Sequence, residues 1–173
     1  CDATLNGHHV GSHEGGFTFF RFDVTDHIVP GSVNTLVVRV SGALGDRTIP
    51  PRGVDWFNYG GIYRPVYLEA TGPARIDDYT ITTRCDGSVV VGALVDGPAT
   101  AGVSVRILDA LDRQVVSGDA PLADGPAGTR RAAMPLRVSD PRLWGPADPY
   151  LYRLELQVLL ENGTVSDRLT KPF

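Results

Sequence analysis

The chain has 173 residues, of which 42% are hydrophobic and 21% are charged, a balance that supports a packed core. The net charge is −4 and the single lysine is Lys171, so nucleic acid and anionic membranes are not expected partners. The apolar runs are too short to cross a bilayer. The chain has two cysteines, Cys1 and Cys85, and no Cys-x-x-Cys pair, which excludes a disulfide-dense scaffold and a thiolate zinc site. We expect two unrelated thiols, with a single bridge between them as the alternative.

Alternation of apolar and polar residues recurs along the chain without helical periodicity, which predicts an all-β protein. In residues 1–72 the chain opens inside a strand, and further strands are expected at 20–24, 36–40 and 62–68. About five short strands are too few for a closed jelly roll. We therefore expect residues 1–72 to be the later half of a larger β domain, and the chain to be a fragment.

A domain boundary is expected at Thr71-Gly72-Pro73, because Pro73 restricts the residue before it. Residues 73–173 have the size of an immunoglobulin-like β-sandwich and lack a Cys…Trp…Cys pattern. Seven strands are expected there, near 76–84, 88–95, 102–109, 113–117, 129–138, 150–160 and 164–170.

The run 55–64, Asp-Trp-Phe-Asn-Tyr-Gly-Gly-Ile-Tyr-Arg, is the strongest candidate for a functional site. Aromatic rings can cover the C–H faces of a sugar, and a carboxylate and an amide can bind its hydroxyls. The two glycines allow positive φ or a close backbone approach. A hairpin with buried aromatic side chains is the structural alternative.

Three other motifs favour structural interpretations. His8, His9 and His13 lie within six residues, but no fourth ligand is evident and we expect no metal site. Trp144 is expected to pack in the core at a strand entry. The triplet 162–164, Asn-Gly-Thr, fits the glycosylation pattern, although Asn-Gly between two strands favours a hairpin turn.

Four segments, in order, resemble motifs of glycoside hydrolase family 2, the β-galactosidase and β-glucuronidase family. They are Asn-Gly at 6–7 with His-Glu-Gly-Gly at 13–16, the run 19–36, the run 55–64, and Leu-Trp-Gly-Pro with Pro-Tyr-Leu-Tyr within 143–152. The resemblance spans essentially the whole chain. It implies the non-catalytic front part of such an enzyme, with 1–72 as the later half of the sugar-binding jelly roll and 73–173 as the immunoglobulin-like domain.

The resemblance also implies residue roles. The two catalytic glutamates of the family lie in a TIM barrel that this chain lacks, so no catalytic residue is expected here. Asp55 is expected to reach into the barrel's active site and bind sugar hydroxyls, with Asn58 and Tyr59 as further substrate-binding candidates. Asn58 can instead order the loop, and Tyr59 can pack it onto the barrel together with Trp56 and Phe57.

The expected function is therefore that of a fragment of a β-glycosidase, inactive alone, with a β-linked sugar and its own catalytic barrel as partners. Homo-oligomer contacts are a further expectation. No cofactor is expected in this fragment, whereas a β-galactosidase-like parent can bind Mg or Na. An independent carbohydrate-binding module is the alternative function, and a structural or adhesive β-sandwich pair is a third. The sugar is not fixed, and the compartment is left open with the cytoplasm favoured.

Overall fold

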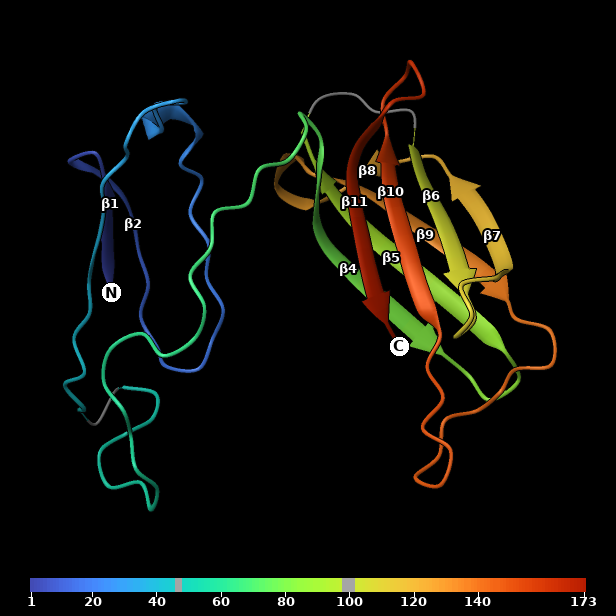
Figure 1. Cartoon of the computed structure of the whole chain (residues 1–173), viewed down its shortest axis with the longest axis horizontal. Helices are drawn as coiled ribbons and strands as arrows, with labels where there is room; N and C mark the ends of the chain where they lie inside the picture. Colours follow the sequence, from blue (N-terminus) through green and yellow to red (C-terminus); the bar gives the residue numbers. More distant parts are fainter. Residues whose placement is uncertain (46–47, 98–101) are drawn as a thin grey trace. The chain divides into compact units, whose positions relative to one another are not determined.

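The computed structural model describes residues 1–45, 48–97 and 102–173. Across these residues the secondary structure is β-strand with two short 3-10 helices and no α-helix, which confirms the all-β prediction. None of the described helical segments is long and apolar enough to cross a membrane. The chain forms two compact units, unit 1 (Cys1–Leu68) and unit 2 (Glu69–Phe173), and this division lies four residues before the boundary expected at residue 72 (Figure 1).

Unit 1 contains one small antiparallel sheet with the strand order β2-β1-β3. Its elements are β1 (Asp2–Leu5), β2 (His8–Ser12), the 3-10 helix η1 (Thr25–His27) and β3 (Leu36–Arg39). The Asn6-Gly7 turn joins β1 to β2 with φ values of 51° and 83°. Positive φ at both positions is typical of a two-residue hairpin turn, which an Asn-Gly pair between two strands favours.

Two asparagines hold the connections of unit 1 together. The Asn6 amide donates to the carbonyl of His27 and to Asn34 Oδ1, both at 2.8 Å, and its oxygen accepts from the backbone N–H of Thr35 at 2.9 Å. Asn34 donates to the carbonyls of Val29 and Ser32. This asparagine network joins the turn after β1 to the segment before β3.

Two predicted strands of unit 1 are wrong for this chain. Residues 20–24 and 62–68 have no strand structure, and large side chains on them are exposed, including Tyr67 at 67%. A strand needs a hydrogen-bonded neighbour, and the described sheet of unit 1 contains only β1, β2 and β3. Alternation alone therefore predicted strands that have no partner here.

Unit 2 is a sandwich of two four-stranded antiparallel sheets (Figure 1). One sheet has the order β11-β10-β6-β7 and the other β4-β5-β9-β8. The strands are β4 (Arg75–Thr83), β5 (Ser88–Asp96), β6 (Gly102–Leu108), β7 (Gln114–Ala120), β8 (Ala123–Asp124), β9 (Arg130–Arg137), β10 (Arg153–Leu159) and β11 (Val165–Pro172), with the 3-10 helix η2 (Pro126–Gly128) before β9. All seven predicted strands are confirmed, and the two-residue β8 is an addition.

The core of unit 2 lies between the sheets and follows the predicted alternation. On β10, Leu154, Leu156 and Val158 are fully buried, and the residues between them face outward. Val105 and Ile107 on β6 are fully buried in the same way. Each such side chain contributes about 1.5–3 kcal/mol on burial, so unit 2 has the core of an independent domain.

Side chains of β11 close one edge of the sandwich. The Ser166 hydroxyl donates to the carbonyl of Ala74 at 2.7 Å and accepts from its N–H at 3.0 Å. Asp167 accepts from the backbone N–H of Ile76 at 2.8 Å. Backbone groups near the start of β4 are thus satisfied by side chains, which protects this edge from pairing with another chain.

Candidate functional site

Asp55 lies in a bend of unit 1 with its side chain exposed to solvent. Among the described residues no side chain or backbone group forms a hydrogen bond or ion pair with its carboxylate. An ionised carboxylate without a protein partner can accept hydrogen bonds from a ligand.

Glycines let the backbone around this run pass close to a second segment. A Cβ on Gly42 would lie 3.3 Å from the Cα of Gly60, so the two backbones are nearly in contact. Gly61 has a φ of 84°, a conformation that other residues rarely adopt. Both expected uses of the glycine pair are therefore confirmed.

The aromatic side chains of the run are exposed rather than buried. Trp56 is 56% exposed, Phe57 79% and Tyr59 69%, while Asn58 is half-buried. The rings of Phe57 and Tyr59 lie 4.9 Å apart in a tilted arrangement. A hairpin with buried aromatics does not describe this structure, because these rings face solvent next to Asp55 in the sequence.

The segment before Asp55 is held by its own hydrogen bonds. The Arg52 guanidinium donates twice to the carbonyl of Leu44, at 2.8 and 3.2 Å. The Gly16 N–H donates to the carbonyl of Ile49 at 2.6 Å, which fastens the loop to the segment after β2. Arg64, at the other end of the run, lies over the ring of Tyr63 at 5.7 Å.

The histidines do not converge on one point. The His8 ring stacks on His27 at 4.8 Å, and the His13 ring stacks on Phe20 at 4.4 Å. His9 Nε2 lies 3.1 Å from the hydroxyl of Ser12. Within residues 1–45, 48–97 and 102–173, no three His, Cys, Asp or Glu side chains are grouped in a way that could hold a metal ion.

Ser12, His9 and Asp2 contain the side chains of a hydrolytic triad in a different arrangement. The Ser12 hydroxyl donates to Asp2 at 2.8 Å, so the carboxylate contacts the serine instead of orienting the histidine. This bond is the main reason that the pKa of Asp2 is lowered, with Arg39 contributing next. We interpret the cluster as a cross-strand polar contact, since Asp2 faces Ser12 in the β1–β2 pairing.

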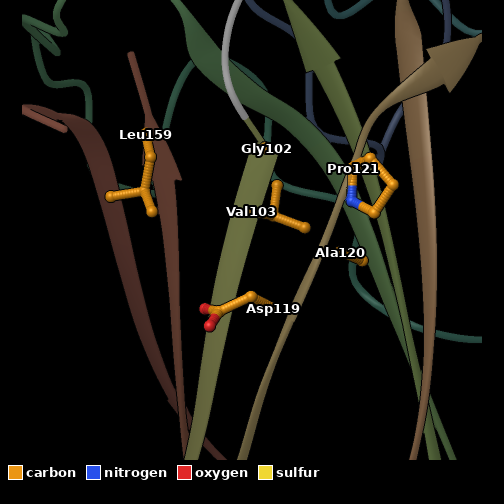
Figure 2. Close-up of a pocket in the computed structure, with 6 residues that line it drawn as sticks. All are labelled: Gly102, Val103, Asp119, Ala120, Pro121 and Leu159. Carbon is orange, nitrogen blue, oxygen red and sulfur yellow. The ribbon is translucent and has the colours of Figure 1, made fainter. Parts of the chain in front are cut away.

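A shallow hollow of about 210 Å³ in unit 2 contains none of the sequence-predicted site residues. Figure 2 shows Val103 on β6, Leu159 on β10, and Asp119 and Pro121 at the end of β7 and just beyond it. The hollow offers one carboxylate and few converging polar groups. It therefore lacks the features of a ligand pocket.

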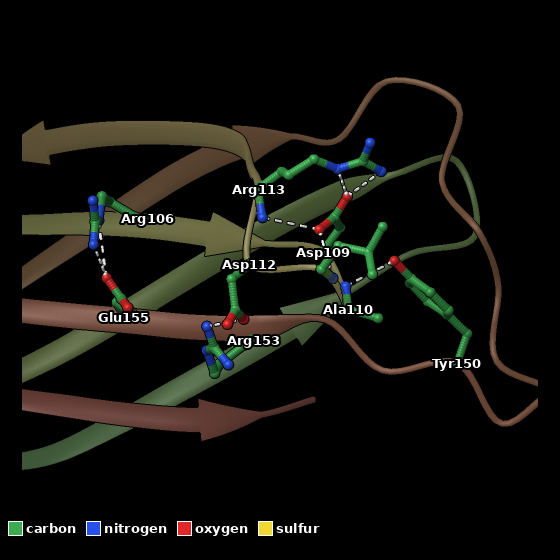
Figure 3. Close-up of polar contacts among 9 residues, drawn as sticks. Arg106, Asp109, Ala110, Asp112, Arg113, Tyr150, Arg153 and Glu155 are labelled. Atoms are coloured by element: carbon green, nitrogen blue, oxygen red, sulfur yellow. Dashed lines mark hydrogen bonds and ion pairs between the residues drawn. The ribbon is translucent and has the colours of Figure 1, made fainter.

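Polar contacts brace the turn between β6 and β7 (Figure 3). The buried Asp109 accepts from the Arg113 side chain at 2.7 Å and from the backbone N–H groups of Leu111 and Arg113. These hydrogen bonds lower the pKa of Asp109, and the bond from the Arg113 side chain makes the largest contribution. The Tyr150 hydroxyl accepts from the N–H of Ala110 at 3.1 Å, which joins this turn to the loop before β10.

That loop, residues 139–150, presents Trp144 to solvent. Arg142 forms two bonds with Asp148, at 2.7 and 2.8 Å, and lies over the Tyr150 ring at 4.4 Å. Trp144 is 61% exposed, so the prediction that it packs in the core is wrong. The loop closes on itself through backbone hydrogen bonds between Gly145 and Asp148. Tyr152, two residues beyond the loop, packs against the core.

Both free thiols agree with the sequence analysis. Cys1 is half-buried and Cys85 is exposed, and neither forms a disulfide.

Of the functional candidates, Asp55, Asn58 and Tyr59 lie on one segment of unit 1. The sequence analysis did not single out the ion pairs Asp109–Arg113 and Arg142–Asp148. Oppositely charged residues at such short spacings are common on solvated surfaces, so their spacing alone gives no specific signal.

Comparisons with known protein families and sequences give a consistent result. A sequence model described as Glycosyl hydrolases family 2 matches residues 74–173. The β-glucuronidase of Paenibacillus borealis is 34% identical over 94% of this chain and 29% of the relative. The β-galactosidase of Thermoanaerobacter pseudethanolicus is 29% identical over 91% of this chain and 22% of the relative. The chain spans less than a third of the length of these relatives and matches their N-terminal part.

Solved structures show the same similarity over nearly the whole chain. A putative β-galactosidase from Bacteroides fragilis superposes with a TM-score of 0.84 at 26% identity, covering 99% of this chain and 28% of that protein. A β-glucuronidase from Ruminococcus gnavus in complex with D-glucuronic acid has a TM-score of 0.81 at 26% identity, covering 99% and 30%. The similarity includes unit 1, which the sequence model of the family does not match.

Proposed function

The chain belongs to glycosyl hydrolases family 2, and from that premise we propose that it is the non-catalytic front part of a retaining β-glycosidase. In this proposal it supplies a scaffold and the sugar-contacting residue Asp55. The two catalytic carboxylic acids of a retaining glycosidase belong to the remainder of the parent protein. The chain alone is then inactive.

One observation carries the proposal: Asp55 is an exposed carboxylate with no hydrogen-bond or ion-pair partner in the described part of the chain, and it lies in a run of exposed aromatic side chains. Carboxylates accept charge-assisted hydrogen bonds from hydroxyl groups, and these bonds fix the orientation of a ligand. Large exposed apolar areas usually mark an interaction surface. Both features support a half-built sugar site that a second domain completes.

The neighbours of Asp55 take different roles in this proposal. Trp56, Phe57 and Tyr59 cover the catalytic domain with their rings, and Tyr59 borders the sugar. The half-buried Asn58 either orders the segment or approaches the sugar with its amide. Homo-oligomer contacts stay a prediction.

The substrate class is a β-linked sugar, either a β-glucuronide or a β-galactoside. Both are supported by the names of the relatives, and neither is preferred by a residue of this chain. A cation in a β-galactosidase-like parent would find no group of three acidic, histidine or cysteine side chains among the described residues. A cation bound by a β-galactosidase-like parent stays a prediction.

The test is an activity assay with the purified chain on chromogenic β-galactoside and β-glucuronide substrates. We expect no turnover above a buffer blank. Turnover by the pure chain would overturn the proposal, because the catalytic pair would then have to lie within it.

The role of Asp55 requires a separate experiment on a longer protein that contains this chain. We expect Asp55→Asn to lower kcat/KM about tenfold to a hundredfold, as loss of charge-assisted bonds does. The matched control is Asp119→Asn, which removes the same charge from the surface of unit 2 and should leave kcat/KM unchanged. An Asp55→Asn protein with unaltered kcat/KM would contradict the assignment.

The exposed aromatic run also favours a second candidate, an independent carbohydrate-binding module. Calorimetric titration of the chain with galactose, glucuronate and oligosaccharides separates the two functions. Millimolar or tighter binding that Asp55→Ala abolishes would favour the module. The absence of a binding signal agrees with a site that needs the catalytic domain.

A further inference from the structure

Two Asn-Gly pairs close hairpins in this chain, and the structure holds their asparagine amides differently. Asn6-Gly7 joins β1 to β2, and Asn162-Gly163 joins β10 to β11. When glycine follows asparagine, the glycine nitrogen can attack the side-chain carbonyl carbon of the asparagine and displace ammonia, because glycine has no Cβ to obstruct ring closure. The two pairs share this sequence chemistry, so any difference between them comes from structure.

The side chain of Asn6 is fully engaged. Its oxygen accepts from the N–H of Thr35, and its nitrogen donates to the carbonyl of His27 and to Asn34 Oδ1. Asn34 is itself fixed by bonds to Val29 and Ser32. Rotation of the Asn6 amide toward the nitrogen of Gly7 therefore breaks three hydrogen bonds at once.

Asn162 lies at an exposed hairpin tip with a single side-chain bond. Its oxygen accepts from the N–H of Thr164 at 2.9 Å. The N–H of Gly163 donates to the carbonyl of Leu160 at 2.8 Å, and Gly163 has a φ of 79°, a geometry typical of a hairpin with a glycine bulge. Residues 161–165 are all exposed, so water can replace these bonds when the tip opens.

We propose that Asn162 is a site of spontaneous deamidation and that the hydrogen-bond network of unit 1 protects Asn6 from the same reaction. The Gly163 nitrogen loses its proton and attacks Cγ of Asn162, forming a C–N bond. The C–N bond to the side-chain amide breaks, and ammonia leaves with the proton it needs. Water then opens the five-membered imide at either carbonyl and gives aspartate or isoaspartate, so no oxidant or reductant is involved.

The modification acts on a hairpin that closes the sandwich. It adds a negative charge beside Glu161, and the isoaspartate product also lengthens the backbone of the turn by one carbon. β11 begins three residues later and supplies Ser166 and Asp167, which satisfy the backbone of Ala74 and Ile76. Deamidation at the tip therefore loosens the edge of unit 2 that this hairpin covers.

The experiment incubates the whole folded chain at mildly alkaline pH and follows tryptic peptides by mass spectrometry. We expect the peptide containing Asn162 to gain the mass of an amide-to-acid exchange, with release of ammonia, and Asn6 to convert at least about tenfold more slowly. In concentrated guanidinium chloride the two asparagines should convert at similar rates, because the difference comes from the fold.

Two variants keep the proposal falsifiable. Asn162→Gln retains an amide but cannot form the five-membered ring, so its peptide should keep its mass. Asn34→Ala removes one partner of Asn6, so Asn6 should convert faster relative to Asn162, which serves as an internal clock. The proposal is overturned if Asn6 converts as fast as Asn162 in the folded chain, or if neither asparagine converts while both do so in guanidinium chloride.

Discussion

Units 1 and 2 have similar apolar content in sequence but very different interiors. Of the buried hydrophobic side chains in the described residues, unit 2 holds sixteen and unit 1 holds two, Ala3 and Leu5. Of the large hydrophobic side chains that are exposed, seventeen belong to unit 1 and seven to unit 2. Unit 2 therefore has its own hydrophobic core, whereas the described part of unit 1 is held by its hairpin and its asparagine network.

The contrast explains where the candidate site lies. Asp55 and the aromatic run belong to the unit that lacks its own core. A surface that is to be covered by another domain must stay apolar and accessible until that domain is present. The missing core of unit 1 and the half-built sugar site are thus, in our proposal, two results of the same shared interface.

A core truncation gives the largest effect in this comparison. Leu156→Ala should destabilise unit 2 by about 2–5 kcal/mol, because it removes a fully buried side chain between the sheets. Leu36→Ala on β3 should lower the free energy of unfolding of unit 1 by less than about 1 kcal/mol, because Leu36 is 49% exposed. Urea unfolding followed by circular dichroism measures both, and equal costs would break the distinction between the units.

Removal of the asparagine network should weaken unit 1 selectively. Asn6→Ala removes three hydrogen bonds and should lower the free energy of unfolding of unit 1 by about 1–3 kcal/mol. Limited trypsin digestion should then cleave unit 1 faster and leave unit 2 unchanged. The control Asn162→Ala, which loses one bond at an exposed tip, should not alter cleavage of unit 1; if it does, the two units are not independent.

The pH dependence of unit 2 tests the bracing of its β6–β7 turn. The pKa of Asp109 in the folded state is lowered, mainly by the hydrogen bond from the Arg113 side chain. The ionised carboxylate therefore stabilises the folded state at pH values above the usual aspartate pKa of about 3.9. This stabilisation is lost as the pH falls through the pKa that Asp109 has in the folded state. Asp109→Asn should be less stable than the wild type at neutral pH and lose less stability on acidification.

Urea midpoints at neutral and acidic pH measure this difference. Asp119→Asn, on β7 outside the turn, should follow the wild type. If Asp109→Asn and the wild type lose stability in parallel on acidification, the carboxylate does not stabilise the turn.

The smallest effect is expected at Trp144. Its side chain is 61% exposed, so Trp144→Ala should change the stability of unit 2 by less than about 0.5 kcal/mol. A tryptophan in the core would cost about 3–5 kcal/mol. Thermal unfolding distinguishes the two values, and a large cost would restore the packing role that the sequence predicted.

The strands of unit 2 could be predicted from the sequence because their partners lie in the same chain. Tyr152, Leu154, Leu156 and Val158 alternate in sequence and face one side of β10 in the structure. The same alternation at residues 20–24 and 62–68 gave strands that the structure lacks. Periodicity reports which face of a segment is apolar, but it does not report whether a neighbouring strand is present.

The candidate site shows the same limit. The composition of 55–64 pointed to sugar chemistry, and its glycines behave as expected. The exposure of Trp56, Phe57 and Tyr59 could not be predicted, because a ring that packs in a core and a ring that faces solvent have the same sequence signature. Trp144 was misplaced for the same reason.

Amide hydrogen exchange of the intact chain tests the central claim most directly, because it measures the two units at once. We expect slow exchange at β5, β6 and β10 in the sandwich core, and exchange in unit 1 that is faster by orders of magnitude, slowest at β1 between its two neighbours. Equal protection of unit 1 and unit 2 would contradict the account, because unit 1 would then be stable without a domain to cover it.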